Sequence, residues 1–214
     1  MDFIPDTGPL LAFTLAAFVL AITPGPDMTL FVGRTLAQGR TAGFAAMGGA
    51  LCGVLVHTTL AAFGLSALLA ASPGAFAVLK IGGALYLGWL AFQAIRNGSS
   101  FNPATLAAGR ERSLASNWLL GLGINLLNPK IILFFVTFLP SFVSAGDPHA
   151  GAKLFFFGVY FVVIGTPVCA GIILAAEAIA GTLKSRPKVM RGIDYVFASV
   201  FSGFAVSILL TPSR

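Results

Sequence analysis

Six apolar stretches, each long enough to cross a lipid bilayer as a helix, dominate this chain of 214 residues. The hydrocarbon core of a bilayer is about 30 Å thick, which a helix of roughly 20 apolar residues spans. The stretches cover residues 10–32, 43–69, 74–95, 117–143, 154–180 and 193–211. Charged residues make up only 9% of the chain, too few to cover a soluble globule of this size. The sequence therefore predicts an all-α integral membrane protein with six transmembrane helices.

The connectors between these stretches are short. The longest, residues 96–116, is too small to fold as a separate soluble domain. We therefore expect a single transmembrane domain over residues 1–214, composed of two three-helix halves at about 8–96 and 116–211. Because each half has an odd number of spans, the halves would have opposite orientations in the membrane, as inverted repeats of transporters do.

Basic residues are distributed unevenly over the connectors. Connectors 33–42, 96–116 and 181–192 fall on one side of the predicted membrane, and the opposite side has only Lys153 and Arg214. The basic residues of the first side are Arg34, Arg40, Arg96, Arg110, Arg112, Lys184, Arg186, Lys188 and Arg191. Cytoplasmic loops are enriched in Lys and Arg, so both termini are predicted outside the cytoplasm. In a five-span alternative, in which the first stretch does not cross, the N-terminus would lie inside. The net charge of +6 is explained by this membrane bias and does not indicate nucleic-acid binding.

Proline interrupts two of the six stretches at corresponding places. The first stretch contains Thr23-Pro24-Gly25-Pro26-Asp27, and the fourth contains Asn128-Pro129-Lys130. Proline breaks helical hydrogen bonding, and free backbone groups are tolerated in a membrane only where they face protein or water. Thr23 and Asn128 are good N-cap residues, each followed by proline at the favoured first helical position. We expect two broken helices, first and fourth, whose interruptions meet near the bilayer midplane. The alternative is a pair of purely structural kinks.

Charged and amide side chains accompany both interruptions. A charge inside the bilayer costs at least about 2.5–3.5 kcal/mol and therefore has a partner or a function. Asp27 would accept a substrate ammonium or carry a proton, unless it forms a salt bridge with Lys130 or Arg34. Lys130 would bind a substrate carboxylate or neutralise Asp27. Asn125 and Asn128 add neutral donors and acceptors on the same stretch.

Two further ionisable residues are candidates for proton coupling. His57 lies in the second stretch and belongs to the residue type that titrates near neutral pH, although it could also be a hydrogen-bonded packing residue. Glu177 lies near the end of the fifth stretch, where the alternative is an interfacial charge. Cys52 and Cys169 are isolated from each other, so we expect no cofactor and no metal site.

Small residues mark surfaces where helices would approach closely. Ala45, Gly49 and Gly53 recur at four-residue spacing in the second stretch, and Gly121 and Gly123 lie in the fourth. Lipid supplies no hydrophobic drive between helices, so small residues at the contact favour association by close packing.

These motifs resemble those of the lysine exporter (LysE/RhtB) family. The resemblance rests on Thr23-Pro24-Gly25-Pro26, Lys80-Ile81-Gly82-Gly83-Ala84-Leu85-Tyr86-Leu87-Gly88-Trp89, Asn125-Leu126-Leu127-Asn128-Pro129-Lys130 and Leu139-Pro140-Ser141-Phe142. It extends from residue 8 to about residue 210. It implies an exporter of amino acids and related small metabolites in the bacterial inner membrane, with six spans in two inverted halves, driven by the proton motive force. It further implies that the central path is lined by Pro24, Gly25, Pro26, Asn128, Pro129 and Lys130.

The residues and the resemblance together predict a secondary-active exporter. Its partners would be a small amino-acid-like substrate, protons and the lipid bilayer. Expected substrate-binding residues are Thr23, Pro24, Gly25, Pro26, Asp27, Asn125, Asn128, Pro129 and Lys130, and expected proton-coupling residues are Asp27, His57 and Glu177.

Alternative functions remain open at this point. One is a membrane-embedded enzyme or accessory subunit without transport activity, although the connectors contain no recognisable catalytic motif. Another is a carrier of a different substrate such as a metal ion, which would favour paired cysteines. The sequence leaves open which amino acid is carried and the oligomeric state, a homo-oligomer included.

Overall fold

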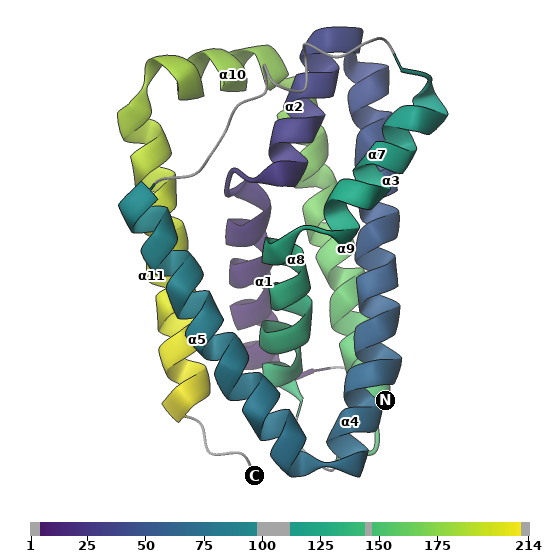
Figure 1. Ribbon diagram of the computed structural model, residues 1–214, viewed down its shortest axis with the longest axis vertical. Helices are drawn as coiled ribbons and strands as arrows, with labels where there is room; N and C mark the ends of the chain where they lie inside the picture. Colours follow the sequence, from purple (N-terminus) through teal and green to yellow (C-terminus); the bar gives the residue numbers. More distant parts are fainter. Residues whose placement is uncertain (1–4, 98–111, 144–146, 211–214) are drawn as a thin grey trace.

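A computed structural model describes residues 5–97, 112–143 and 147–210, and within these ranges every regular element is a helix (Figure 1). The first half contains α1 (Thr7–Ile22), α2 (Pro26–Gln38), α3 (Arg40–Leu60), the π-helical turn η1 (Ala61–Leu65), α4 (Ser66–Ala71) and α5 (Pro73–Asn97). The second half contains α7 (Leu114–Leu126), α8 (Pro129–Leu133), the π-helical η2 (Phe134–Phe138), the 3-10 helix η3 (Leu139–Phe142), α9 (Ala150–Leu174), α10 (Ala176–Ser185) and α11 (Pro187–Leu210). The prediction of an all-α chain is confirmed for this part of the sequence.

Three segments are individually long and apolar enough to cross a membrane. They are Arg40–Leu68, Ala150–Leu174 and Lys188–Val206. The number rises to five if each of two bent helix pairs counts as one span. Helix α5 occupies the predicted third stretch but is not among these candidates, so six spans remain a prediction.

The two bent pairs are the broken helices that the proline motifs predict. Helices α1 and α2 meet at an angle of 47°, and α7 meets the segment Pro129–Phe142 at 50°. The two pairs run through the bundle in opposite directions (Figure 1). This arrangement is the one that inverted halves require, while the repeat itself remains a prediction.

The fifth helix ends earlier than the sequence indicates. An apolar stretch at 154–180 predicts one continuous helix, but α9 ends at Leu174 and α10 lies across the end of the bundle (Figure 1). The Arg40 guanidinium donates to the Leu174 carbonyl oxygen at 3.3 Å, which satisfies one of the free carbonyls at the end of α9. Apolar periodicity carries no signal for such a contact between distant residues.

Helices α3 and α7 approach each other closely enough to exclude side chains. A Cβ atom on Gly49 would lie 1.8 Å from the Trp118 carbonyl oxygen, and one on Gly121 would lie 1.9 Å from the Ala46 carbonyl oxygen. The predicted packing role of Gly49 and Gly121 is confirmed. Gly123 has no neighbour within 4 Å of its own Cβ position, so it does not share this role.

A cluster of phenylalanine rings joins α1, the segment after the second break, and α9. Phe13 lies 4.7 Å from Phe157 and 5.7 Å from Phe134 between ring centroids, and Phe134 lies 4.9 Å from Phe138. All four rings are fully buried. Burying aromatic side chains is strongly favourable, so this cluster fixes half of each broken helix in the bundle.

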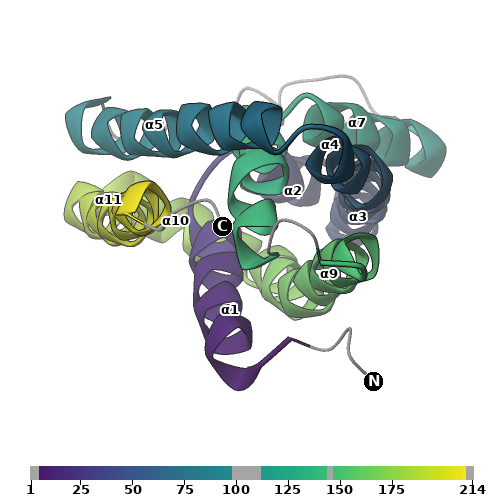
Figure 2. The same ribbon diagram turned by 90° about the horizontal axis from the view of Figure 1, so that it is seen from below.

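Helices α5 and α11 form a pair of their own beside this bundle. They pack along each other, and Figure 2 shows them on one side of the molecule, apart from α3 and α9. Arg191 of α11 donates to the Ile95 carbonyl oxygen of α5 at 2.7 Å.

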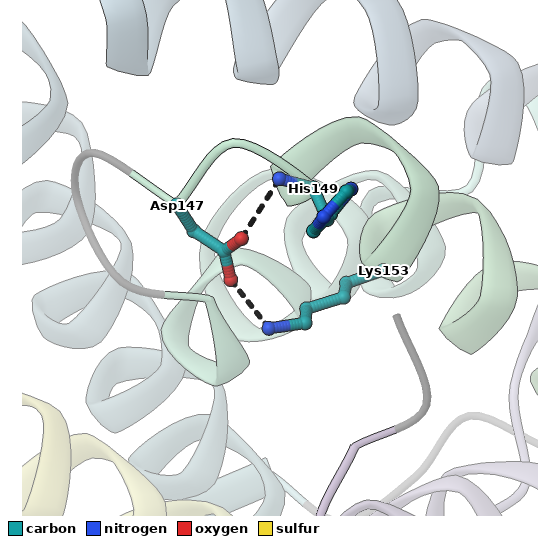
Figure 3. A network of polar contacts seen from close by, with 3 residues as sticks. All are labelled: Asp147, His149 and Lys153. Carbon is teal, nitrogen blue, oxygen red and sulfur yellow. Dashed lines mark hydrogen bonds and ion pairs between the residues drawn. The ribbon is translucent and has the colours of Figure 1, made fainter. Parts of the chain in front are cut away.

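Two of the three predicted basic connectors, 33–42 and 181–192, lie at one end of the molecule, and most of the third, residues 98–111, lies outside the described residues. The α2–α3 junction, the start of α7 and α10 share that end, whereas α1 begins and α11 finishes at the other (Figure 1). Arg110 and Arg214 lie outside the described residues, and the direction of the chain across the membrane remains a prediction. At the end opposite the basic connectors, Lys153 donates to Asp147 at 2.5 Å and the backbone N–H of His149 donates to the same carboxylate at 2.8 Å (Figure 3). The hydrogen bond from Lys153 holds the pKa of the Asp147 carboxyl below its ordinary value.

Candidate functional site: the two helix breaks

At the first break, the new helix begins two residues later than predicted. Helix α1 continues to Ile22, and Thr23 closes it, since both its N–H and its hydroxyl donate to the Val19 carbonyl oxygen, at 3.1 and 2.6 Å. The residue flanking α2 is Gly25, and Pro26 is the first helical residue. Assigning the start to Thr23 and Pro24 was wrong because a residue before proline avoids helical geometry, and Gly25 precedes Pro26.

The second break follows the prediction closely. Asn128 is the N-cap of α8, with its side-chain oxygen accepting from the Lys130 N–H at 3.1 Å, and Pro129 occupies the first helical position. The first break has two prolines, Pro24 and Pro26, either of which could be the first helical residue. The second break has only Pro129.

Asp27, in the first turn of α2, is held by two amides from the other broken helix. Its Oδ2 atom accepts from Asn125 Nδ2 at 2.9 Å and from Asn128 Nδ2 at 3.0 Å. Among the described residues no donor reaches the buried Oδ1 atom. The buried Oδ1 of Asn125 is likewise without a donor in this part of the chain. Two acceptors are therefore available to a ligand that carries hydrogen-bond donors.

Lys130 makes the opposite connection, from the second break to the first. Its ammonium donates to the Thr23 carbonyl oxygen at 2.9 Å and to the Leu20 carbonyl oxygen at 3.1 Å. These carbonyls lie at the end of α1, where the helix dipole is negative and favours a cation. Among the hydrogen bonds and ion pairs of the described residues, Lys130 thus pairs with backbone carbonyls rather than with Asp27.

Each break therefore supplies hydrogen-bond partners for polar groups of the other. The first gives a carboxylate to the amides of the second, and the second gives an ammonium to the carbonyls of the first. We call this arrangement the crossed contact, comprising Asp27, Asn125, Asn128, Lys130 and the Leu20 and Thr23 carbonyls.

A cavity of about 50 Å³ lies beside the crossed contact, inside the bundle. Asp27, Asn125 and Lys130 line it, and apolar side chains from α2, α3 and α9 complete its wall. This volume has room for a few water molecules. We call it the inner cavity.

A second cavity of about 470 Å³ lies on the other side of the breaks, against α5 and α11. All of Thr23, Pro24, Gly25 and Pro26 line it, as do Asn128, Pro129 and Lys130. We call it the outer cavity. The predicted site residues therefore gather around two adjoining cavities.

The two remaining candidates for proton coupling lie in different places. His57 is buried, its Nε2 lies 3.4 Å from the Asn125 carbonyl oxygen, and its ring packs against Phe135. It therefore touches the crossed contact through Asn125. Glu177 is exposed on α10, where it borders a pocket with Arg40, and the structure does not bring it to Asp27.

Sequence reasoning missed two features of this site. The Leu20 and Thr23 carbonyls are backbone groups, for which side-chain patterns carry no signal. Gly53 was expected only as a packing residue, but its Cβ position lies 2.6 Å from Asn125 Oδ1, so the missing side chain makes room for that amide. Cys169 also lines the inner cavity.

A comparison with protein-family models identifies residues 18–211 as a LysE type translocator. The chain belongs to this family. The resemblance inferred from the proline motifs is thereby confirmed, and the chain is a translocator by family. Its apolar helices fit a multi-pass membrane protein.

Curated relatives of the translocator cover nearly its whole length. It is 30% identical over 203 residues to the homoserine/homoserine lactone efflux protein of Salmonella typhimurium, across 95% of this chain and 96% of the relative. It is 30% identical to the leucine efflux protein of Klebsiella pneumoniae, across 95% of each. An uncharacterized membrane protein of Vibrio cholerae is 31% identical across 90% of this chain and 92% of the relative. No solved structure matches the chain.

Proposed function

We propose that this translocator exports amino acids or related small metabolites across the bacterial inner membrane, in exchange for protons. The observation that carries the proposal is the crossed contact, in which Asp27 and Lys130 face a cavity between two helix breaks. The Salmonella and Klebsiella relatives are named as efflux proteins for homoserine and homoserine lactone and for leucine, which supports a substrate of this kind.

An amino acid carries one ammonium and one carboxylate, and the crossed contact has one group of each sign. The substrate ammonium donates to Asp27 Oδ1 and Asn125 Oδ1, the two acceptors that lack a donor among the described residues. The substrate carboxylate faces Lys130 and the N–H groups at the start of α2. The carboxylate draws Lys130 away from the α1 carbonyls, so substrate binding and opening of the breaks are coupled.

Proton exchange follows from the same carboxylate. When the substrate leaves, Asp27 takes a proton, which keeps it neutral inside the bilayer where an unpaired charge is costly. His57, in contact with Asn125, is the neighbouring group best placed to pass that proton. Glu177, exposed on α10, would act at most at the entrance. In this proposal both termini lie outside the cytoplasm.

Counterflow in proteoliposomes tests the proposal. Vesicles loaded with unlabelled amino acids are diluted into traces of labelled homoserine, leucine, threonine or lysine, and uptake is compared with that of protein-free vesicles. We expect counterflow of at least one of these compounds, and an imposed proton gradient should drive its net movement. Absence of movement for every compound, with folded protein confirmed, would overturn the proposal and favour an enzyme or accessory subunit.

The Asp27→Asn variant tests whether proton coupling depends on the Asp27 carboxylate. It keeps the shape of the side chain and removes its charge, so we expect proton-driven efflux to fall to background while the protein still reaches the membrane. Asp147→Asn is the matched control, because that carboxylate lies at the far end of the bundle and pairs with Lys153. Full efflux by the Asp27 variant would contradict the proposed role.

A further inference from the structure

The outer cavity differs from the inner one in size and in composition. Its volume of about 470 Å³ falls within the range of about 300–1,000 Å³ that small-molecule sites occupy, whereas the inner cavity, at about 50 Å³, falls well below it. Of the two cavities that border the helix breaks in the described part of the chain, only the outer one has room for an amino acid.

Polar groups on α5 face the breaks across this cavity. Gln93 and Asn97 line it, and the Asn97 amide donates to the Gln93 side-chain oxygen. They lie one helical turn apart on the same face of α5, opposite Asn128 and Lys130. Trp89 of α5 and the buried Phe197 of α11 supply apolar wall. A third cavity, between η1 and α9, is lined almost wholly by apolar side chains and so lacks this combination.

The charge that lines the outer cavity is of one sign, positive. Lys130 is the sole charged residue that lines it in the described part of the chain, and no carboxylate does. An amino acid with a neutral side chain can place its carboxylate near Lys130 and its polar groups on the amides. A lysine or arginine side chain would bring a second cation into a partly buried cavity that offers it no partner, which is unfavourable.

Thr23 and Lys130 line both cavities, so the bond between them lies where the cavities adjoin. A substrate carboxylate in the outer cavity competes with the Thr23 carbonyl for the Lys130 ammonium. A carboxylate is a stronger acceptor than a neutral carbonyl, so its binding would break the hydrogen bond between Lys130 and the Thr23 carbonyl. That hydrogen bond separates the two cavities.

We propose that the outer cavity is a second substrate site, in which Gln93 and Asn97 bind the polar part of an amino acid with an uncharged side chain and Lys130 binds its carboxylate. The proposal rests on the transport function proposed above and adds a substrate class to it. Amino acids with basic side chains are rejected there, and Gln93 is a specificity-determining residue.

A charge placed at Gln93 tests the selectivity. We expect Gln93→Glu to raise the rate of lysine counterflow relative to leucine on the order of tenfold, the scale of a hydrogen bond to a charged group. The isosteric neutral control Gln93→Met should raise the KM for leucine about two- to tenfold, as loss of one neutral hydrogen bond does, without admitting lysine.

The outcomes separate this inference from the proposed function. If the wild-type protein carries leucine and both Gln93 variants keep its KM and its leucine-to-lysine ratio, the second site is wrong and the transport function stands. A wild-type preference for lysine would overturn the substrate class. If the wild-type protein carries none of the compounds, both proposals fail.

Thiol labelling gives a readout that does not depend on turnover. In a Cys52→Ala, Cys169→Ala background, Gln93→Cys should react with a small thiosulfonate reagent, and leucine should slow the reaction while lysine should not. Ala37→Cys, exposed near the end of α2 and outside both cavities, is the control whose labelling leucine leaves unchanged. Equal labelling of Gln93→Cys with and without leucine would overturn the proposal.

Discussion

The two helix breaks bend their helices by similar angles, 47° and 50°, but they are built differently. The first is an extended linker in which Thr23 closes one helix and Gly25 precedes the next. The second is compact, because Asn128 caps the new helix with its own side chain. The first break offers two buried backbone carbonyls and a carboxylate, whereas the second offers amides and an ammonium.

This difference gives a physical reason for the first break to depend on the second. Free carbonyls and a buried carboxylate are costly inside a bilayer unless donors reach them. The second break supplies those donors through Asn125, Asn128 and Lys130. A transporter can exploit such a contact, because separating the breaks exposes groups that a substrate of the right charges can satisfy instead.

Removing the ammonium should affect the first break most. Lys130→Met leaves the Leu20 and Thr23 carbonyls without a donor, at a cost of about 1–3 kcal/mol for each buried acceptor. We expect efflux to fall to background and the melting temperature in detergent to drop by roughly 4 °C or more. The control is Lys153→Met at the end of the bundle, which should transport normally. If Lys130→Met had the efflux rate and melting temperature of the wild-type protein, the hydrogen bonds from Lys130 to the α1 carbonyls would be dispensable.

A smaller effect should follow from displacing Asn125. A Cβ atom on Gly53 would lie 2.6 Å from Asn125 Oδ1, so Gly53→Ala should push this amide away from Asp27 and lower efflux several-fold. Gly48→Ala on the same helix places its Cβ at an ordinary 3.5 Å from Trp118 and serves as the control. Both changes carry the same helix-propensity gain of about 1 kcal/mol, so the difference between them isolates Asn125. Equal efflux from the two variants would argue against its role.

The parts of this site that could be predicted are those that depend on local chemistry. Proline predicts both breaks, and the Asn128 cap follows from its side chain and the single proline after it. The start of α2 was also within reach, since Gly25 before Pro26 excludes an earlier helix. N-cap preference alone favours Thr23, and the restriction that Pro26 places on Gly25 overrides it.

The parts that could not be predicted depend on contacts between distant residues. Lys130 binds backbone carbonyls more than 100 positions away in the sequence. Arg40 of α3 donates a hydrogen bond to the Leu174 carbonyl at the end of α9. Glu177 belongs to an apolar stretch in the sequence, yet the turn after Leu174 carries it away from Asp27. Hydropathy indicates which residues enter a membrane but not which of them meet.

The smallest effect is expected for the charge pair outside the breaks. Asp147→Asn should leave transport unchanged and lower stability by about 1 kcal/mol, because this ion pair is half-buried near the end of the bundle. Because Lys153 lowers the pKa of Asp147 in the folded protein, this contribution is present above the ordinary carboxyl pKa and is lost as pH falls through the lowered value. Melting temperatures of the two proteins should therefore converge in acid. A difference that persists or grows at low pH would contradict this assignment.

A double-mutant cycle between the breaks tests the crossed contact most directly. Asp27→Ala removes the carboxylate, and Asn128→Ser removes the amide donor while keeping an N-cap residue. We predict that the double variant loses less unfolding free energy than the sum of the two single variants. The difference should be about 1.5–3 kcal/mol, the value of a hydrogen bond to a charged group. Losses that add within about 0.5 kcal/mol, as for independent sites, would show that the two breaks do not hold each other.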